Sequence, residues 1–255
     1  MRDRHVAGRR LEVLHHPPPE PGAATIVFLH EGLGSAGQWK DFPKRLSALC
    51  GCGFLTYSRW GYGGSDARPQ PWPADFLEAE ATVVLPELLA AEAITRPVLF
   101  GHSDGGTIAL LYAAAVPDGV RGVISEAAHV MLEDISIEGI TRARDRFLHG
   151  DLRPRLLRQH GDHAEDTILG WTGNWLRPEM RAWDIRERLR AIRCPVLVVQ
   201  GRDDDFGTLE QVEAIVSHAG GPAERLILDA CGHVPHRERP RDVIETATRF
   251  IERLR

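Results

Sequence analysis

One serine in this chain has the neighbours that could make it a nucleophile. Ser103 lies at the centre of Gly101-His102-Ser103-Asp104-Gly105, which matches the pattern G-x-S-x-G. In that pattern the serine occupies a sharp turn between a strand and a helix, and the flanking glycines let the two elements approach closely. A serine hydroxyl is a weak nucleophile at neutral pH and needs a base, which in turn needs an acid to orient it. The motif therefore predicts a histidine and a carboxylate as partners of Ser103.

Suitable partners follow Ser103 at the ends of two later apolar segments. Three aspartates, Asp203, Asp204 and Asp205, come directly after the segment 195–201, and His233 follows the segment 225–231. The order serine, acid, histidine is that of hydrolases built on this turn. We predict that His233 is the general base, which then acts as general acid, and that one of the aspartates orients it. No histidine or glutamate at ligand spacing accompanies the aspartates, so we predict no metal site.

The elements that must position these residues are short apolar segments that alternate with longer helical ones. Strands are predicted at Arg9–His16, Thr25–Glu31, Gly53–Arg59, Pro97–His102, Gly119–Glu126, Pro195–Gly201 and Arg225–Cys231. Helices are predicted at Trp39–Leu49, Ala74–Ala93, Gly105–Ala115, Leu209–His218 and Pro240–Leu254. The central strand segments are apolar without alternation, which indicates a sheet covered on both faces. The sequence therefore predicts an α/β fold with a doubly wound, mostly parallel sheet.

The segment between Glu126 and Cys194 interrupts this alternation. It is too long for an unstructured loop in a compact domain, and its pattern is charged and helical. We predict a small helical cap at residues 129–185, inserted before the strand at 195–201, and an α/β core formed by residues 1–128 and 186–255. Trp171 and Trp175 of this segment are candidate substrate-binding residues, and the alternative is that they are ordinary core residues.

The composition is that of an ordinary globular protein and argues against several functions. The chain has 255 residues, 43% of them hydrophobic, and a formal net charge of −5 without a basic tract, which argues against nucleic acid as a partner. No apolar run approaches the ~20 residues that span a bilayer, and the N-terminus has no apolar signal core. We therefore expect no membrane partner and a cytoplasmic protein whose four cysteines are reduced. The oligomeric state does not follow from the composition.

A second glycine motif predicts a different activity. Residues 32–37, Gly32-Leu33-Gly34-Ser35-Ala36-Gly37, match G-x-G-x-x-G between a predicted strand and a predicted helix, as in dinucleotide-binding folds. Those folds place an acidic residue at the end of the next strand, whereas this chain has Arg59 there, which could bind the 2′-phosphate of NADP. An NADP-binding reductase is therefore an alternative, although no Tyr-x-x-x-Lys pair follows.

Four motifs in order resemble those of serine hydrolases with the α/β-hydrolase fold, over essentially the whole chain. Besides the turn at Ser103, they are Leu29-His30-Glu31-Gly32-Leu33-Gly34-Ser35, Ser58-Arg59-Trp60-Gly61-Tyr62-Gly63-Gly64-Ser65-Asp66 and Gly232-His233-Val234-Pro235-His236-Arg237-Glu238-Arg239-Pro240. The resemblance implies a cofactor-free reaction in which a carboxylic ester acylates Ser103 and water then releases the acyl group. Amide, thioester, lactone and carbon–carbon hydrolysis and perhydrolysis stay open as alternatives, as does a binding module without activity.

The resemblance also implies a role for each site residue. Similar hydrolases place the acid three residues beyond the glycine that ends the strand, which selects Asp204 and leaves Asp203 as the alternative. The oxyanion hole, the pair of N–H groups that binds the negative oxygen of the intermediate, would consist of Asp104 and Gly32. Because Glu31 stands where the family usually has glycine, Leu33 is the alternative to Gly32.

Asp104 departs from the family, which often has an apolar or aromatic residue at this position. The Ser-Asp-Gly-Gly sequence is similar to that of valacyclovir hydrolases, which act on amino-acid esters. One hypothesis is therefore that Asp104 binds a cationic group on a small ester substrate. The alternative is that an arginine or lysine of the protein neutralises Asp104, because an unpaired carboxylate would oppose the negative charge that develops nearby.

Overall fold

The chain folds around one eight-stranded sheet. In the computed structural model, which describes residues 1–254, the strand order is β1-β2-β4-β3-β5-β6-β7-β8. The strands are β1 (Arg2–Val6), β2 (Arg9–His16), β3 (Thr25–Leu29), β4 (Gly53–Tyr57), β5 (Val98–His102), β6 (Gly122–Glu126), β7 (Val196–Gly201) and β8 (Ala223–Leu228). Only the pairs β1–β2 and β2–β4 are antiparallel, so the predicted doubly wound, mostly parallel sheet is confirmed.

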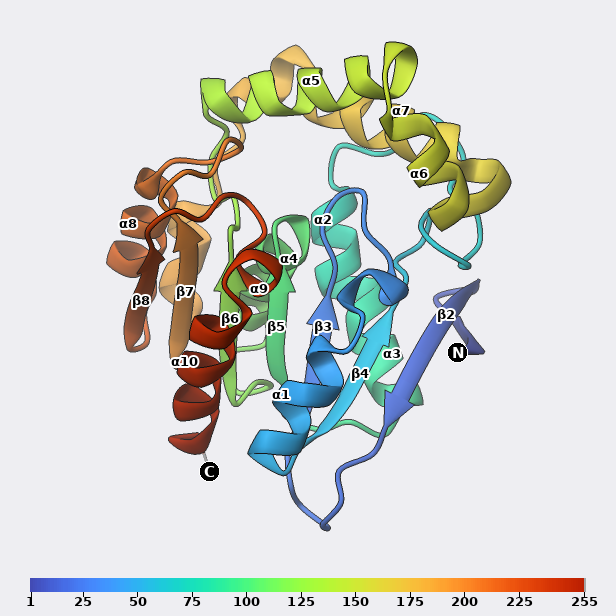
Figure 1. Ribbon diagram of the computed structural model, residues 1–255. Coiled ribbons are helices and arrows are strands. Elements are labelled where there is room, and N and C mark those ends of the chain that lie inside the picture. The colour runs from blue at the N-terminus through green and yellow to red at the C-terminus, as the bar shows by residue number, and fades with distance from the viewer. Residues whose placement is uncertain (255) are drawn as a thin grey trace.

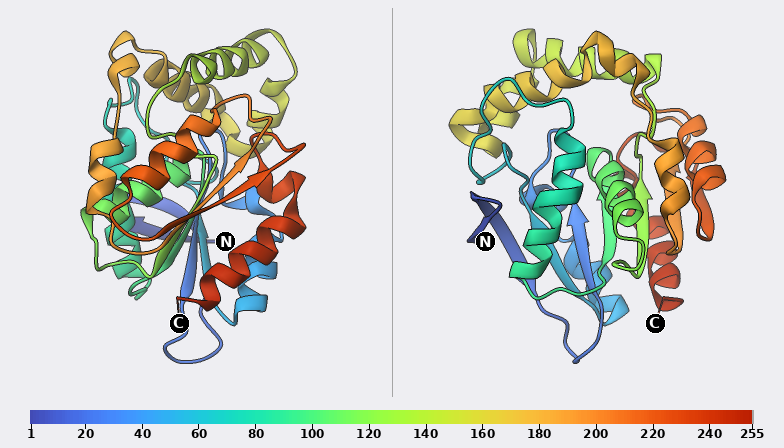
Figure 2. Two further views of the ribbon diagram at one scale, coloured as in Figure 1. Left: turned by 90° about the vertical axis from the view of Figure 1, so that its left-hand side faces the viewer. Right: turned by 180° about the vertical axis from the view of Figure 1, so that it is seen from behind.

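Helices cover both faces of this sheet (Figure 2). They are α1 (Phe42–Cys50), α2 (Phe76–Ala79), α3 (Leu85–Ala91), α4 (Asp104–Ala115), α8 (Leu209–His218), α9 (Pro235–Glu238) and α10 (Pro240–Glu252). Helices α1 and α10 pack against one face, in a core that contains Phe28, Phe42 and Phe250. Helices α3, α4 and α8 pack against the other face, in a core that contains Leu88 and Ile108. The sheet therefore lies between two separate hydrophobic layers.

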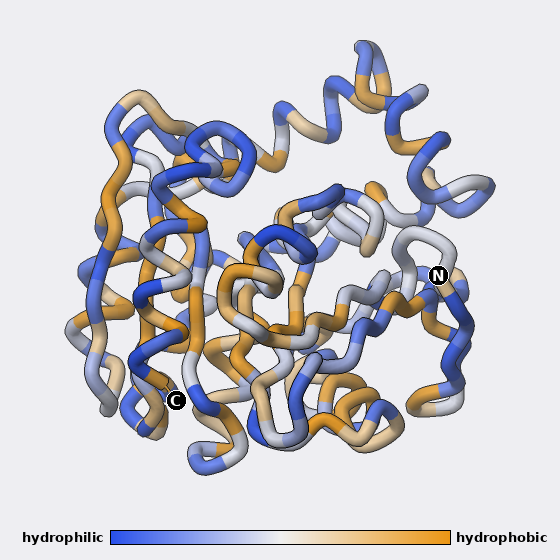
Figure 3. The backbone as a smooth tube through the Cα atoms, turned by 60° about the horizontal axis from the view of Figure 1, so that its bottom comes forward, coloured by the Kyte–Doolittle hydropathy of each residue, from blue (hydrophilic) through white to orange (hydrophobic). Residues whose placement is uncertain are grey.

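The central strands are buried because both of their faces meet one of these layers. Every residue of β3, β4, β5, β6 and β7 is buried. Helix α4 is also central, since all of its residues except the last two are buried. Figure 3 shows hydrophobic segments along the interior strands, whereas the outer helices alternate between hydrophobic and hydrophilic turns. This burial gives the strand ends, where the candidate site residues lie, a rigid support.

Most predicted elements differ from the observed ones by a few residues at their ends, and three differences are larger. Strand β1 was not predicted, because it is a charged edge strand without an apolar pattern. Ion pairs of Arg2 and Arg4 with Glu92 connect it to the rest of the domain. The predicted helix 74–93 is broken by the π-helical turn η2 (Glu80–Val84) between α2 and α3. Strand β8 ends at Leu228 and not at Cys231, because the last three residues turn toward His233.

The segment inserted between β6 and β7 is helical, as predicted. It contains α5 (Asp134–His149), α6 (Leu152–His160), α7 (Ala164–Trp175) and the short 3-10 helices η3 (Gly161–His163), η4 (Pro178–Ala182) and η5 (Arg186–Ala191). Helices α5, α6 and α7, which we call the helical cap, lie above the carboxyl ends of the parallel strands (Figure 1). The cap has a small hydrophobic core of its own around Phe147 and Ile168. The boundaries of a cap domain at residues 129 and 185 stay a prediction.

The sequence predicts no membrane-spanning segment. Among residues 1–254, no helix combines the length and the apolar character that crossing a bilayer requires.

Candidate active site

The turn at Ser103 has the strained geometry that its motif predicts. Ser103 connects β5 to α4 with φ 54° and ψ −120°, a backbone conformation that residues other than glycine rarely adopt. A Cβ atom on Gly101 would collide with the carbonyl of Gly105, and one on Gly105 would collide with the carbonyl of Leu29. Only glycine therefore allows the strand and the helix to approach so closely. The surrounding backbone holds the serine in a conformation that a free chain would avoid.

His233 is held by Asp204 and not by either neighbouring aspartate. Its Nδ1 lies 2.9 Å from both carboxylate oxygens of Asp204, so the N–H at Nδ1 donates and Nε2 is left as the basic nitrogen. Asp203 is exposed, and Asp205 is also exposed and pairs with Arg142 on the cap. The geometry thus supports Asp204, the residue selected from the sequence.

The Asp204 carboxylate is itself fixed by further donors. Its Oδ1 accepts from the backbone N–H of Phe206 at 2.8 Å, and its Oδ2 accepts from Gln200 Nε2 at 2.6 Å. Burial would raise the pKa of Asp204, but His233 and the N–H of Phe206 outweigh burial and hold the pKa below its usual value. The carboxylate therefore stays ionised beside the imidazole.

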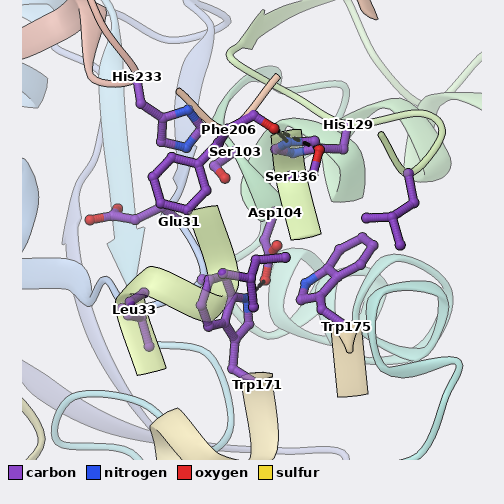
Figure 4. A pocket seen from close by; sticks show the side chains of 14 residues that line it. Glu31, Leu33, Ser103, Asp104, His129, Ser136, Trp171, Trp175, Phe206 and His233 are labelled. Carbon is purple, nitrogen blue, oxygen red and sulfur yellow. Dashed lines mark hydrogen bonds between the residues drawn. The ribbon is translucent and has the colours of Figure 1, made fainter. Parts of the chain in front are cut away.

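Ser103 and His233 line one cavity of about 100 Å³ beneath the cap. Figure 4 shows the side chains of Ser103 and His233 around this cavity, together with Asp104 and the indoles of Trp171 and Trp175. The remaining lining residues are Glu31, Gly32, Leu33, His129, Leu132, Ser136, Ile140, Ala143 and Phe206. The structure thus brings every site residue predicted from the sequence, except the buried Asp204 behind His233, to the wall of a single cavity.

The loop formed by residues 30–34, which we call the oxyanion loop, brings both of its candidate donors to this cavity. Gly32 and Leu33 line it, and the Gly32 backbone lies so close to the Trp171 indole that a Cβ atom there would collide with it. The N–H of Asp104 belongs to the first residue of α4, where no intrahelical acceptor is available. These are the N–H groups that the sequence analysis assigns to the oxyanion hole, and that role stays a prediction.

Asp104 is paired within the protein. Its Oδ2 lies 3.4 Å from Nη2 of Arg59 and accepts a hydrogen bond from the Trp171 indole at 3.2 Å. Both charged side chains of the pair are almost fully buried. The structure therefore contains the protein cation that one of the two hypotheses for Asp104 requires. It also overturns the NADP hypothesis, because Arg59 is enclosed and engaged and cannot bind a 2′-phosphate.

A buried cluster supports the His233 loop from behind. His102 Nε2 donates to the backbone carbonyl of His233 at 2.8 Å, and His236 Nδ1 donates to Glu126 at 2.6 Å. Burial would lower the pKa of His102, but Glu31 and Glu126 outweigh burial and raise it to about 9. The ligand atoms of His102, Glu126 and His236 lie within 4.8 Å of one another, close enough to hold a metal ion. The hydrogen bonds of these side chains already occupy one polar atom of each.

The cap contacts the oxyanion loop through two adjacent residues of α6. Gln159 Nε2 donates to the carbonyl of Leu33 at 2.7 Å, and His160 Nε2 donates to the same oxygen at 3.3 Å. His160 Nδ1 accepts from the N–H of Gly63 at 2.9 Å, so this histidine needs its neutral form. Burial lowers the pKa of His160 to about 4, which favours that form.

Among the pocket residues that were not predicted from the sequence, His129 and Phe206 each lie shortly after the end of a strand. His129 lies three residues beyond β6, and its Nε2 donates to the carbonyl of Phe206 at 2.9 Å. Phe206 lies two residues beyond Asp204, with its ring 4.6 Å from that of His233. Their position after parallel strands was the available signal, since ligands of open α/β sheets bind beyond the carboxyl ends of the strands.

Comparison with known proteins adds relatives and neighbours. The chain is 26% identical to 2-succinyl-6-hydroxy-2,4-cyclohexadiene-1-carboxylate synthases of Salmonella enteritidis PT4 and Salmonella typhimurium LT2, in alignments that cover 92% of this chain and 97% of each relative. Its fold is similar to that of a bacterial membrane phospholipase A, with 20% identity, a TM-score of 0.80 and coverage of 99% and 86% of the two chains. An enol-lactonase from Burkholderia xenovorans LB400 is also 20% identical, with a TM-score of 0.75 and coverage of 98% and 100%.

The family itself follows from a match over most of the chain. Residues 26–246 match the model of the alpha/beta hydrolase family, a range that includes Ser103, Asp204 and His233. The resemblance inferred from four short motifs is therefore confirmed, and with it the fold. This chain belongs to the alpha/beta hydrolase family.

Proposed function

We propose that this protein is a serine hydrolase that cleaves small carboxylic esters through Ser103, His233 and Asp204. The observation that carries the proposal is the His233 imidazole, oriented by Asp204 at 2.9 Å, in one cavity with a serine on a strained turn. A serine with a merely structural role would need neither the strain nor the oriented imidazole.

The acylation step follows from this arrangement. His233 Nε2 takes the proton of the Ser103 hydroxyl while the serine oxygen attacks the ester carbonyl carbon. The carbonyl oxygen becomes negative and is bound by the N–H groups of Asp104 and of the oxyanion loop, where Gly32 is the preferred donor and Leu33 the alternative. Asp204 stabilises the imidazolium that forms. The intermediate then expels the alcohol, which receives its proton from His233.

Deacylation repeats the same steps with water. His233 removes a proton from a water molecule whose oxygen attacks the acyl-enzyme, and the oxyanion forms in the same hole. When the serine oxygen leaves, it takes the proton back from His233. The products are a carboxylic acid and an alcohol, and no cofactor takes part.

The cavity favours a short, uncharged acyl group. Its volume of about 100 Å³ is below the roughly 300 Å³ at which drug-sized ligand pockets begin. The described residues that line it include two carboxylates, Glu31 and Asp104, and no lysine or arginine. Because Arg59 already neutralises Asp104, the cavity offers neither an unpaired cation for an anionic substrate nor a free Asp104 for an ammonium group. The name of the Salmonella synthases contains a carboxylate, but no lysine or arginine lines this cavity to bind one.

We treat residues 129–185 as a cap domain that sets the substrate size. Seven residues of this range line the cavity together with the strand-end residues of the core: His129, Leu132, Ser136, Ile140, Ala143, Trp171 and Trp175. The cap therefore closes the space that the acyl group would occupy.

Labelling with a fluorophosphonate, combined with hydrolysis of p-nitrophenyl acetate, tests the proposed function. We expect the reagent to add to Ser103, and we expect both the labelling and the hydrolysis to vanish in Ser103→Ala. Ser136→Ala is a matched control, because Ser136 lines the same cavity but donates its hydroxyl to the carbonyl of Phe206 at 2.6 Å. Labelling that persists in Ser103→Ala, or that vanishes in Ser136→Ala, would overturn the assignment.

A further inference from the structure

We infer that Arg59 is a positioning residue for the oxyanion hole, because its guanidinium holds the two chain segments that carry the two N–H donors. The inference rests on the proposed function and adds to it a residue that does not line the cavity. Arg59 follows β4, which carries none of the three triad residues. In the sequence, Arg59 is part of one of the four family-like motifs and a candidate phosphate ligand, and neither pattern predicts this role.

Arg59 is buried between the oxyanion loop and the start of α4. It is 2% exposed, and its guanidinium carbon lies 4.5 Å from the centre of the Tyr62 ring. Its Nη2 donates to the carbonyl of Glu31 at 3.0 Å and lies 3.4 Å from Oδ2 of Asp104. One nitrogen atom thus contacts both segments at once. A buried guanidinium with fixed partners loses little mobility during a reaction, which suits it to positioning.

The contact with Glu31 orients the N–H of Gly32. In a trans peptide the carbonyl oxygen and the following N–H point in opposite directions. The carbonyl of Glu31 accepts from Arg59 Nη2, and also from His30 Nδ1 at 2.7 Å and from the N–H of Gly34 at 3.1 Å. These donors hold the carbonyl on the protein side, which leaves the Gly32 N–H on the opposite side. A flip of this peptide would break all three hydrogen bonds and would turn a carbonyl toward the developing oxyanion.

The contact with Asp104 serves the other donor. Asp104 supplies its own N–H to the proposed hole, while its carboxylate lies at the wall of the same cavity. An unpaired negative charge there would raise the energy of the oxyanion. Arg59 cancels that charge and, together with the Trp171 indole, fixes the orientation of the side chain. Arg59 therefore orients the Glu31–Gly32 peptide on one side of the hole and neutralises the Asp104 carboxylate on the other.

A purely structural role predicts different behaviour from a positioning role. If Arg59 only neutralised a buried carboxylate, removing both charges at once would restore the function. If it also orients the Glu31–Gly32 peptide, the loss of its donor to Glu31 persists in the doubly neutral protein. The pair Arg59→Met/Asp104→Asn, which leaves no unpaired buried charge, separates these two roles.

The experiment compares Arg59→Lys and Arg59→Met/Asp104→Asn with the wild-type protein. The measurements are kcat and KM for p-nitrophenyl acetate and the inhibition constant of a trifluoromethyl ketone, whose tetrahedral adduct carries an oxyanion. Removing a whole oxyanion donor costs about 10²–10³ in kcat, so we expect a misplaced donor to lower kcat by about tenfold to a hundredfold. We expect the inhibition constant to rise by a similar factor while KM changes less than about twofold. Arg68→Lys is the control, because Arg68 is also buried but stacks on Trp60 and Trp72 away from the loop.

The outcomes separate the two proposals. Wild-type protein that is not labelled at Ser103 would overturn the proposed function. Wild-type protein that is labelled and active, with a doubly neutral variant that keeps the wild-type kcat and inhibition constant, would overturn the role of Arg59 alone. If Arg59→Lys fails to fold, the doubly neutral variant still decides. A fall in kcat with an unchanged inhibition constant would also contradict the inference, because the oxyanion contacts would then be intact.

Discussion

The strand ends of the core and the helices of the cap supply the candidate site in different ways. Ser103 follows β5 and Asp204 follows β7, and each of these strands is hydrogen-bonded to a neighbouring strand on both sides. His233 follows β8, which is hydrogen-bonded to the buried strand β7. Trp171 and Trp175 project instead from a helix that rests on the core through side chains. The topology of the sheet therefore positions the proposed reacting groups, whereas side-chain packing positions the residues that line the rest of the cavity.

The two regions also differ in how firmly they are held. All residues of β5 and β7 are buried, whereas only four of the sixteen residues of α5 are. The cap reaches the oxyanion loop through Gln159 and His160, which share one carbonyl acceptor. Substitutions at the strand ends should therefore abolish activity or folding, and substitutions in the cap should change conformational stability or substrate range.

The largest effect is expected at the triad. Asp204→Asn should lower kcat by about 10⁴, because an amide favours the wrong tautomer of His233 and does not stabilise the imidazolium. Asp203→Asn is the matched control and should keep kcat within about twofold, since Asp203 is exposed beside the same turn. Steady-state kinetics with p-nitrophenyl acetate measures both. A large loss in the Asp203 variant with an active Asp204 variant would reverse the assignment.

Replacing a glycine by alanine should reduce conformational stability in the core but not in the cap. Gly105→Ala places a methyl group against the carbonyl of Leu29, which the backbone cannot easily move, and should lower the free energy of unfolding by about 3 kcal/mol or more. Gly173 on α7 has nothing within 4 Å of its Cβ position, so Gly173→Ala should leave stability unchanged or raise it by up to about 1 kcal/mol. Urea unfolding measures both values. Equal losses at the two sites would contradict the contrast between the regions.

Acidification should remove the stabilisation that neutral His160 contributes between the cap and the loops it contacts. The pKa of His160 falls from 6.5 to about 4 on folding, so the neutral form is favoured and its contribution is complete above pH 6.5. As the pH falls from 6.5 to 4, the unfolded chain binds the proton first and up to about 3 kcal/mol of stability is lost. His160→Gln should reduce this pH dependence, and His149→Gln, at an exposed position of α5, should not. Unfolding free energies at pH 7 and pH 5 test this, and equal slopes in all three proteins would exclude the effect.

The smallest effect is expected for substrate range. Ile140 lines the cavity from α5, and Ile140→Ala should raise the preference for p-nitrophenyl butyrate over the acetate by about tenfold, the lower end of what one methylene group supplies in an apolar pocket. Leu148→Ala, on the same helix but 46% exposed, should leave that ratio unchanged. The ratio of the two kcat/KM values is the measurement. An unchanged ratio in the Ile140 variant would show that the cap does not limit the acyl group.

The local hydrophobic pattern predicted most strands and helices of the core, but it did not predict strand β1 or the π-helical turn η2. Strand β2 and helix α8 have the predicted bounds, because each has a clear apolar pattern between turn signals. Strand β1 escaped because an edge strand needs little apolar character when its partner supplies the hydrogen bonds. The turn η2 escaped because its residues suit a regular helix, so nothing in their pattern indicates the wider π-helical turn.

The sequence by itself predicted the family, the parallel sheet and the candidate triad of Ser103, His233 and Asp204, the last with Asp203 as its alternative. It could do so because a strained turn and a strand end require particular residues at short spacing, and such signals are local. Only the tertiary structure decided that Arg59 pairs with Asp104 and supports the Glu31 carbonyl, and that Gln159 and His160 contact Leu33. These contacts join residues far apart in the chain. Their partners depend on how the helices pack and which way side chains point, which no local pattern encodes.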